Sequence, residues 1–549
     1  MIVWDTTESI SEYPELIKKI YFNISIQYRK NFTNWIGGLA ENHLYNLDLW
    51  SSIPFSRNKY LSDLFHVICV LETLSKLKNK NIKLQVILLY KNLGDQIYEW
   101  SKNKKIDLSI LVKNKKGYFN LTIFKSICFY FFTYFWIKIF YNNNILKQES
   151  SNILITTFAK IESKEDDLFF PGLINYLNSN NKKNVFFVPT FLSQKNIFNT
   201  IKEIKILSKK NYVFKEAILN LNDIIYAAKH VLRVNKLKFD KIKYKNWDLK
   251  KIFIEELTTT KNYSSKMTSI LNYKFVEKLS KKNLKIIKTI DLFENQIINK
   301  GWNMGFRKFY PKTKTFGYQN FTYYPHNLNL FPSTFEEKAK VVPSRLVVIG
   351  NAFKKSRKEF FPRLKVNVGP ALRYQHLLKK QNFESNKQIL IVLNGISLKD
   401  NIKLLNWIAA ATNNFKKIKI YVKEHLILKI KNTTKKKFGT KFEFTNKKFS
   451  TIIKKSSIVV SNGPTSATVE SLVYNSRIIV PVFDPADSLI FKNLKIKKKN
   501  VHFVFNLTQL KNKINHLVKQ KLNKHNKIDL TLAKYFFSKI NDETMKYFI

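Results

Sequence analysis

Short apolar runs alternate with helix-like stretches through the second half of the chain. Five of these runs are rich in Ile, Val and Leu, and each ends in a polar turn: residues 345–351, 388–395, 418–425, 456–463 and 477–483. Strands that alternate with helices predict a parallel sheet with helices on both faces. Because such sheets bind ligands where the carboxyl ends of their strands meet the loops, we expect a binding crevice at that edge.

The first half of the chain shows the same alternation. Its strand-like runs are residues 82–90, 106–112, 152–158 and 184–191, and its helix-like stretches include residues 61–77 and 169–180. A further strand, helix and strand are predicted within residues 284–318. Residues 321–344 hold three prolines and little periodicity, which is typical of an interdomain linker.

We therefore predict an α/β protein with two large domains. The predicted units are a first domain over residues 1–320, a linker over 321–344, a second domain over 345–510 and a Lys-rich helical segment over 511–549. A chain of 549 residues with 44% hydrophobic and 14% aromatic residues is long and apolar enough to bury two cores.

Residues 119–141 interrupt the alternation with an aromatic-rich helical insertion in the first domain. Seven of the eight residues from Phe129 to Trp136 are aromatic, and only twelve uncharged residues separate Lys125 from Lys138. A helix that spans a membrane needs about 20 apolar residues, so a span is the least favoured interpretation. A buried core helix and a helix on the surface of an anionic membrane are the other two, and the flanking lysines favour the membrane surface.

The stretch at residues 458–481 carries the clearest chemical signal. An apolar run ends at Ser461, and a helical pattern begins after Gly463, Thr465 and Ser466. The start of a helix presents unpaired backbone N–H groups and partial positive charge, to which the hydroxyl groups add donors. Such a turn predicts a site for a phosphate or diphosphate, although the same residues also favour an ordinary helix cap. Glu470, one helical turn later, could accept hydrogen bonds from a ribose.

Polar residues follow three other strands of the same predicted sheet. Lys423 and His425 end the run at 418–425, Asn351 ends the run at 345–351, and Asn394 and Gly395 end the run at 388–395. Because the carboxyl ends of parallel strands share one edge, these residues are expected to line the same crevice.

The net charge of the chain has two explanations. It is +57, from 96 Lys and Arg against 39 Asp and Glu. Such a charge is typical of proteins that bind nucleic acid or anionic membranes, but the abundance of Lys, Asn, Ile and Phe also fits the bias of an AT-rich genome. No helix-turn-helix, ribonucleoprotein-type aromatic signature or zinc-finger spacing is evident, so we predict no specific nucleic-acid partner.

Arginine and cysteine usage is more specific. Only nine residues are Arg, and five of them fall between positions 307 and 373. Arg forms planar, bidentate contacts with phosphate, so Arg345 and Arg357 are predicted as possible phosphate contacts. The two cysteines define neither a disulfide framework nor a metal site. The first residues lack the basic and apolar regions of a secretory signal, and we expect a cytoplasmic protein.

The chain resembles a known family, the bacterial surface-carbohydrate (O-antigen and capsule) biosynthesis proteins with a GT-B glycosyltransferase architecture. The resemblance lies in FENQ (293–296), FGYQN (316–320), VPSRLVVIGN (342–351), VKEH (422–425) and SNGPTSATVESLVYNSRIIVP (461–481), and it extends to residues 34–65. It implies two Rossmann-like domains that face each other across a cleft, the second binding a nucleotide sugar and the first binding a glycan or lipid-linked acceptor.

The resemblance also implies a chemistry. Transfer of a sugar needs a base for the acceptor hydroxyl and positive charge for the leaving phosphate. Glu294, at the end of a predicted strand, is the candidate base. The donor contacts are expected from Asn351, Lys423, His425, Gly463, Thr465, Ser466 and Glu470, without a metal or other cofactor. We expect a protein at the inner face of the cytoplasmic membrane. A sugar-nucleotide epimerase, a nucleic-acid-binding protein and a non-catalytic envelope-assembly scaffold stay open as alternatives.

Overall fold

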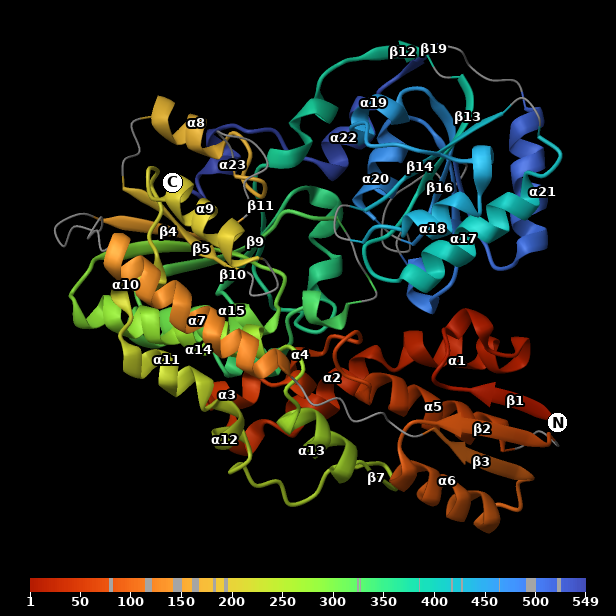
Figure 1. The fold of residues 1–549 in the computed structure, drawn as a ribbon, viewed down its shortest axis with the longest axis horizontal. Coiled ribbons are helices and arrows are strands. Elements are labelled where there is room, and N and C mark those ends of the chain that lie inside the picture. The colour runs from red at the N-terminus through yellow and green to blue at the C-terminus, as the bar shows by residue number, and fades with distance from the viewer. Residues whose placement is uncertain are drawn as a thin grey trace.

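Two six-stranded parallel sheets form the centres of the two large bodies of the protein (Figure 1). The computed structural model describes residues 1–78, 82–113, 121–141, 151–159, 167–180, 184–191, 196–322, 325, 327–384, 386–415, 418–425, 428–463, 465–489, 500–520 and 525–549. The two sheets confirm the predicted fold class, two Rossmann-like α/β units on either side of a cleft.

The sheet of the first body has the strand order β11-β10-β9-β8-β4-β5. Its strands are β4 (Asn152–Phe158), β5 (Val185–Thr190), β8 (Ile286–Leu292), β9 (Lys314–Gln319), β10 (Arg345–Val348) and β11 (Val366–Val368). The longer helices packed around it are α7 (Leu121–Phe140), α9 (Ile197–Leu207), α11 (Leu221–Ala228), α13 (Lys250–Thr258), α14 (Tyr263–Lys281) and α15 (Ile297–Phe309). Shorter helices are α8 (Leu173–Ser179), α10 (Lys215–Ile218), α12 (His230–Val234) and α16 (Thr334–Lys338).

The sheet of the second body has the order β15-β14-β13-β16-β17-β18. Its strands are β13 (Asn386–Val392), β14 (Lys419–Lys423), β15 (Glu443–Phe444), β16 (Ser456–Ser461), β17 (Arg477–Pro481) and β18 (Val501–Val504). Its main helices are α17 (Leu398–Ala411), α20 (Ser466–Val473), α21 (Leu507–Lys519) and α22 (Leu530–Phe536), with the short α18 (Asn432–Lys436) and α19 (Phe449–Ile453).

Strand β13 shows why this sheet has two covered faces. Ile389 and Ile391 belong to one apolar cluster with residues of α17 and α21, whereas Leu390 and Val392 belong to the other cluster, with residues of α20. Successive side chains of a strand point to opposite faces, so a continuous apolar run requires helices on both sides.

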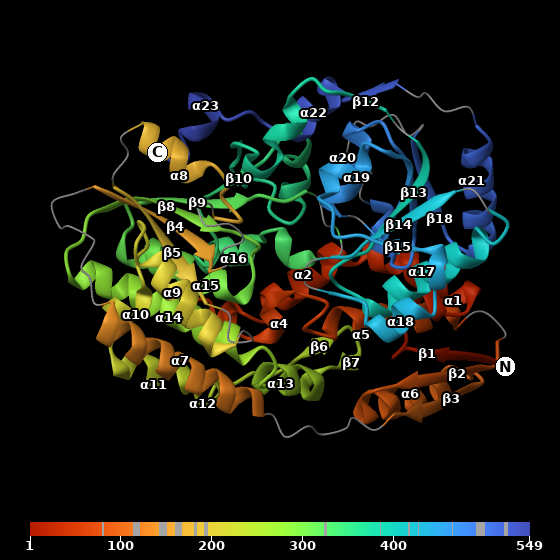
Figure 2. The same cartoon turned by 45° about the horizontal axis from the view of Figure 1, so that its top comes forward.

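Residues 1–112 form a separate lobe rather than part of the first sheet. Its parallel sheet is β1-β2-β3 (Ile2–Asp5, Leu84–Leu88, Leu108–Val112). Its helices include α1 (Glu15–Gln27), α2 (Arg29–Gly38), α5 (Leu64–Leu77) and α6 (Lys91–Asn103), with the short α3 (Leu47–Trp50) and α4 (Ile53–Ser56). In both views the sheet of this lobe, with α1, α5 and α6, lies beside the second body (Figures 1 and 2), whereas α3 and α4 contact α12, α13 and α15 of the first body. Lys403 Nζ lies 2.6 Å from a carboxylate oxygen of Glu12, and Lys399 pairs with Glu8.

The predicted domain boundary at residue 345 is wrong. Strand β10 pairs with β9 and β11, so residues 345–368 complete the first sheet. The predicted linker at 321–344 therefore joins two strands of one sheet, and it includes α16 and many buried residues. The chain crosses to the second body only after β11, through the 3-10 helix η6 (Leu372–Leu378).

The C-terminal segment returns to the first body. It contains β19 (His525–Lys527), paired with β12 (Asn382–Glu384), then α22 and α23 (Asp542–Met545). The ring of Phe548 packs against Phe170 and Tyr318, and Lys288 Nζ donates to the backbone carbonyl of Lys546 at 3.0 Å. The predicted helical segment at 511–549 is thus a strand and helices that tie the two bodies together.

Helix α7 contains the aromatic-rich stretch. Its inner side contacts α10, α11 and α14, and Tyr130 Oη donates to the Ser264 carbonyl at 3.1 Å. Its outer side leaves Phe124 68% and Ile139 70% exposed. Residues 123–140 are long and apolar enough to span a membrane by length and composition, and 33% of them are buried against the protein.

Candidate functional site

A cleft separates the carboxyl edges of the two large sheets. Its volume is about 570 Å³, and residues that follow β8 and β9 line one side while residues that follow β13, β14, β16 and β17 line the other. The predicted residues that line it are Glu294, Lys423, His425, Gly463, Thr465, Ser466 and Glu470. The cleft therefore brings together most of the residues that the sequence singled out.

The turn between β16 and α20 has the geometry of a helix start. Gly463 has a φ of +73°, the left-handed region in which a side chain is strained. Thr465 is the N-cap residue, and its backbone N–H donates to Thr468 Oγ1 at 3.2 Å. Ser461 Oγ lies 2.7 Å from the same hydroxyl. These bonds fix the direction of α20, whose first N–H groups and partial positive charge lie at the cleft.

The polar residues Glu424 and His425, at the end of β14, have different roles. A carboxylate oxygen of Glu424 accepts the Ile430 N–H at 2.7 Å, and the other accepts from Lys435 at 2.7 Å, so Glu424 holds the following loop. The His425 ring packs against Gly395, where a Cβ would lie only 2.3 Å from Nδ1. Gly395 is therefore required for the position of His425 in the cleft.

Glu294 lies on the opposite side of the cleft, just after β8. Burial raises the pKa of its carboxyl, against the opposing effects of the Gln296 hydrogen bond and the Arg373 charge. The next residue, Asn295, has a φ of +50°, and Asn329 Nδ2 donates to the Glu294 carbonyl at 2.8 Å. A carboxylate with a raised pKa in a cleft has the properties of a general base.

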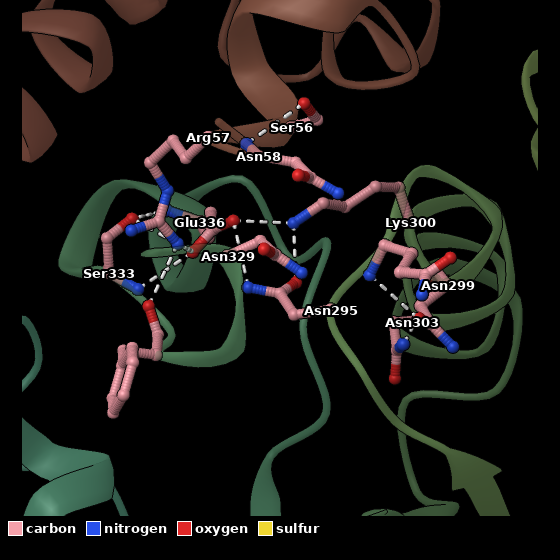
Figure 3. Close-up of polar contacts among 12 residues, drawn as sticks. Ser56, Arg57, Asn58, Asn295, Asn299, Lys300, Asn303, Asn329, Ser333 and Glu336 are labelled. Carbon is pink, nitrogen blue, oxygen red and sulfur yellow. Dashed lines mark hydrogen bonds and ion pairs between the residues drawn. The ribbon is translucent and has the colours of Figure 1, made fainter. Parts of the chain in front are cut away.

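A buried network holds the turn that carries Glu294 (Figure 3). Lys300 Nζ donates to Asn295 Oδ1 at 2.5 Å and to Glu336 at 2.5 Å, and Asn295 Nδ2 donates to Glu336 at 3.1 Å. Arg57 from the N-terminal lobe adds a 2.6 Å ion pair to Glu336. Side chains from three segments thus fix the left-handed backbone at Asn295.

Arg373 is a cleft residue that is not among the predicted site residues. It is exposed, it lies on η6 between the two bodies, and it lines the cleft. Burial raises the pKa of Glu294 and raises the pKa of Glu470 to about 7, and the positive charge of Arg373 acts to lower both pKa values. The guanidinium therefore lies near carboxylates of both bodies. The clustering of arginines at 307–373 was the signal that pointed to it.

Three aspartates place negative charge on the second-body side of the cleft. They are Asp400, Asp484 and Asp487. Asp487 Oδ1 would lie 3.1 Å from a Cβ on Gly463, and Lys59 pairs with Asp484 at 2.5 Å. An anion is thus favoured near Ser466 and Arg373 rather than beside Gly463.

Three predicted site residues lie elsewhere. Arg345 begins β10, at the edge of the sheet opposite the cleft. Arg357 is 0% exposed and donates to the Thr322 carbonyl at 3.1 Å. Asn351 is exposed on the 3-10 helix η4 (Asn351–Phe353) of the first body, since β10 belongs to the first sheet. None of the three lines the cleft between the bodies, so the structure does not bring them together with the other predicted phosphate and donor contacts.

Within the described part of the chain, no group of three or more His, Cys, Asp or Glu side chains is arranged to hold a metal ion.

No protein-family model matches the sequence, and no curated protein is significantly similar to it. Several solved structures are similar to this chain, with low sequence identity and low TM-scores. The trehalose 6-phosphate synthase of Burkholderia multivorans is 9% identical with a TM-score of 0.37, over 72% of this chain and 94% of that one. A glycosyltransferase from Rickettsia africae is 11% identical with a TM-score of 0.37, over 71% and 91%.

A third similar structure is MnaA of S. aureus with UDP, 10% identical with a TM-score of 0.39, over 72% of this chain and 94% of that one. All three scores are low, and the fold assignment depends on the two parallel sheets and the cleft between them.

Proposed function

We propose that the protein is a glycosyltransferase that moves a sugar from a nucleotide-sugar donor to an acceptor hydroxyl. The observation that carries the proposal is the cleft itself, in which Glu294 of the first body and the start of α20 in the second body line one space. A base and an anion-binding helix start on opposite walls are the two parts that glycosyl transfer requires.

The second body would bind the nucleotide. The first-turn N–H groups of α20, the Ser466 hydroxyl and the Arg373 guanidinium would stabilise the negative charge of the leaving phosphate. Lys423 and His425 would contact the donor from the neighbouring strand end, and Glu470 would accept hydrogen bonds from the ribose. No step in this scheme uses a metal ion or another cofactor.

The first body would bind the acceptor. Glu294 would take the proton of the attacking hydroxyl as the bond to the sugar forms and the bond to the phosphate breaks. Its raised pKa makes the ionised carboxylate a stronger base for this proton. We propose a growing surface polysaccharide or a lipid-linked glycan as the acceptor, from the resemblance to surface-carbohydrate biosynthesis proteins.

We also propose that the protein acts at an anionic membrane surface and contacts it through α7. The outer side of this helix is apolar and aromatic, with Phe124 68%, Ile139 70% and Phe140 57% exposed. Burial lowers the pKa of Lys138, and the nearby charges of Lys282 and Lys278 lower it further. Aromatic residues beside a basic cluster match an interface of anionic lipid.

The membrane contact is tested by sedimentation with phosphatidylglycerol or phosphatidylcholine vesicles. Wild type should bind the anionic vesicles, less so at high salt, and Ile139→Ser with Phe124→Ser should weaken binding at least fivefold. Tyr98→Ser, which changes an exposed aromatic residue on α6, is the control. Equal binding by all variants, or a change of oligomeric state in place of vesicle binding, would reject the contact.

The catalytic proposal is tested by thermal-shift measurements with UDP-, GDP-, CMP- and CDP-linked sugars. A stabilising nucleotide at 100 times its Kd should add about 2.7 kcal/mol. We expect one nucleotide class to stabilise the wild type and to lose its effect in Ser466→Ala and His425→Ala. Conversion of the nucleotide sugar without any acceptor would instead indicate the epimerase, and a salt-dependent shift with short DNA alone would indicate a nucleic-acid-binding protein.

A further inference from the structure

Described residues between β9 and α16 form part of the first-body side of the cleft. Asn320, Phe321, Asn327 and Leu330 from this stretch line the cleft together with Glu294. We refer to the described residues 320–322, 325 and 327–331 as the wall segment. All of it except Asn320 lies within the predicted linker over 321–344, but most of its residues are buried.

Three arginines donate hydrogen bonds to backbone carbonyls of the wall segment. Each donates to a different carbonyl: Arg357 Nη2 to Thr322 at 3.1 Å, Arg29 Nη1 to Pro325 at 2.5 Å and Arg57 Nη2 to Phe331 at 2.9 Å. The chain has only nine arginines in total, so a third of them contact this one stretch.

The arginines also pack against aromatic rings. The guanidinium carbons of Arg29 and Arg357 lie 5.5 Å and 5.6 Å from the centre of the Phe331 ring. The three side chains belong to residues that are at most 5% exposed. A planar guanidinium can stack on a ring and donate to a carbonyl at once, which a Lys ammonium cannot do.

The wall segment is connected to the candidate base. Asn329 Nδ2 donates to the Glu294 carbonyl at 2.8 Å, and Gln319 Nε2 donates to the Leu330 carbonyl at 3.0 Å. Figure 3 shows that Arg57 also reaches the Glu336 carboxylate, which accepts from Asn295 beside the base. The arginines therefore fix the wall segment and Glu294 relative to each other.

The cleft side of the wall segment offers the groups that a saccharide requires. Phe321 of the wall segment and Phe169, which precedes α8, line the cleft, and aromatic rings offer apolar faces for the C–H groups of a sugar ring. Asn320 and Asn327 also line the cleft, and an amide side chain can donate to or accept from a sugar hydroxyl. An acceptor hydroxyl placed there would lie on the same side of the cleft as Glu294.

We propose that the wall segment is the binding subsite for a saccharide acceptor, and that Arg29, Arg57 and Arg357 are positioning residues for it. The inference rests on the proposed function, because it assigns the acceptor of the same cleft. It adds which residues of the first body contact the sugar part of the acceptor and which residues position them.

The test measures the KM for the acceptor and the Kd for the nucleotide separately. Wild type, Asn327→Ala, Phe321→Ala and Arg357→Lys are assayed with the stabilising nucleotide sugar and a panel of octyl glycosides of glucose, galactose, mannose and N-acetylglucosamine. We expect the KM for the glycoside to rise at least tenfold in each variant, while the Kd for the nucleotide changes less than twofold.

Arg307→Lys is the matched control, because Arg307 pairs with Glu337 in the same body and donates to Val342 rather than to the wall segment. Asn327→Ala and Phe321→Ala alter cleft-facing side chains, so they keep the test valid if Arg357→Lys does not fold.

The possible failures are distinct. If no nucleotide sugar binds the wild type, the proposed function fails. If the nucleotide binds but no glycoside of the panel is glycosylated, the saccharide subsite is rejected. An equal loss of nucleotide affinity and glycoside KM in the variants, or an equal loss in Arg307→Lys, would reject the positioning role.

Discussion

Replacing Glu336 by Gln should destabilise the first body strongly. The Glu336 carboxylate is 1% exposed, and it accepts from five donors: Arg57, Lys300, Asn295, and the N–H and hydroxyl of Ser333. Gln keeps the shape of the side chain but removes its charge and turns an acceptor into a donor. Two buried cations, Arg57 and Lys300, then lose their counter-charge.

The pKa of Glu336 gives the size of the effect. Burial alone would raise it, but Arg57 and Lys300 lower it from 4.5 to about 2. At 1.36 kcal/mol per pKa unit, the ionised carboxylate contributes about 3 kcal/mol to folding. Because the folded pKa is the lower one, this contribution is complete above pH 4.5 and is lost as the pH falls towards 2. Removing one partner of a buried ion pair costs about 3–5 kcal/mol, which agrees.

Lys300 gives the variant a way to reduce this loss. Burial and the Arg57 charge lower the pKa of Lys300, and Glu336 opposes that decrease. Without the carboxylate the pKa of Lys300 should fall further, so the ammonium would release its proton as the pH rises. The destabilisation of Glu336→Gln should therefore be smaller at pH 9 than at pH 7.

Thermal unfolding tests both expectations. At about 2 °C per kcal/mol for a large domain, Glu336→Gln should lower Tm by about 6 °C at pH 7. Glu337→Gln, at a partly exposed ion pair with Arg307, should lower it by 2 °C or less. The reasoning is refuted if the two variants have equal Tm, or if the Glu336→Gln deficit grows between pH 7 and pH 9.

Four further variants test the cleft. Glu294→Gln should lower kcat by about 10²–10⁴ without weakening nucleotide binding. Arg373→Ala should move the acidic limb of kcat/KM to higher pH, because Arg373 lowers the pKa of Glu294. Steady-state kinetics measure both, and an unchanged kcat or an unchanged acidic limb would contradict the role of Glu294 as the base. Asp487→Asn should tighten nucleotide binding severalfold at low salt, as measured by calorimetry, and unchanged affinity would exclude repulsion by this carboxylate. Gly395→Ala should weaken nucleotide binding as much as His425→Ala does, and wild-type affinity in Gly395→Ala would contradict the proposed contact.

The sequence predicted the strands and the helix start well, because those features depend on local patterns. The apolar runs at 152–158 and 388–395 became strands β4 and β13, and the polar turn after Ser461 became the start of α20. A buried apolar run with helices on both faces can pair its backbone hydrogen-bonding groups in few ways other than as a strand of a sheet.

The errors concern features that depend on partners distant in the sequence. The run at 345–351 looks the same whether it pairs with β9 or with β13, so its sheet could not be read from its own residues. The burial of Arg357 required rings brought from other segments, including Phe321 and Phe331. An Arg in sequence gives no sign of whether it will meet a phosphate or an aromatic cluster.

The most direct test of the account is the affinity of the stabilising nucleotide sugar for Arg373→Ala and Arg345→Ala, measured by calorimetry. Arg373 lines the cleft, whereas Arg345 begins β10 at the opposite edge of the sheet. If the phosphates lie between the two bodies, Arg373→Ala should weaken binding by about 10- to 100-fold, since a charge-assisted hydrogen bond contributes about 1.5–3 kcal/mol. Arg345→Ala should bind like the wild type. Equal affinities of wild type and Arg373→Ala, or a larger loss in Arg345→Ala, would contradict nucleotide binding in the cleft.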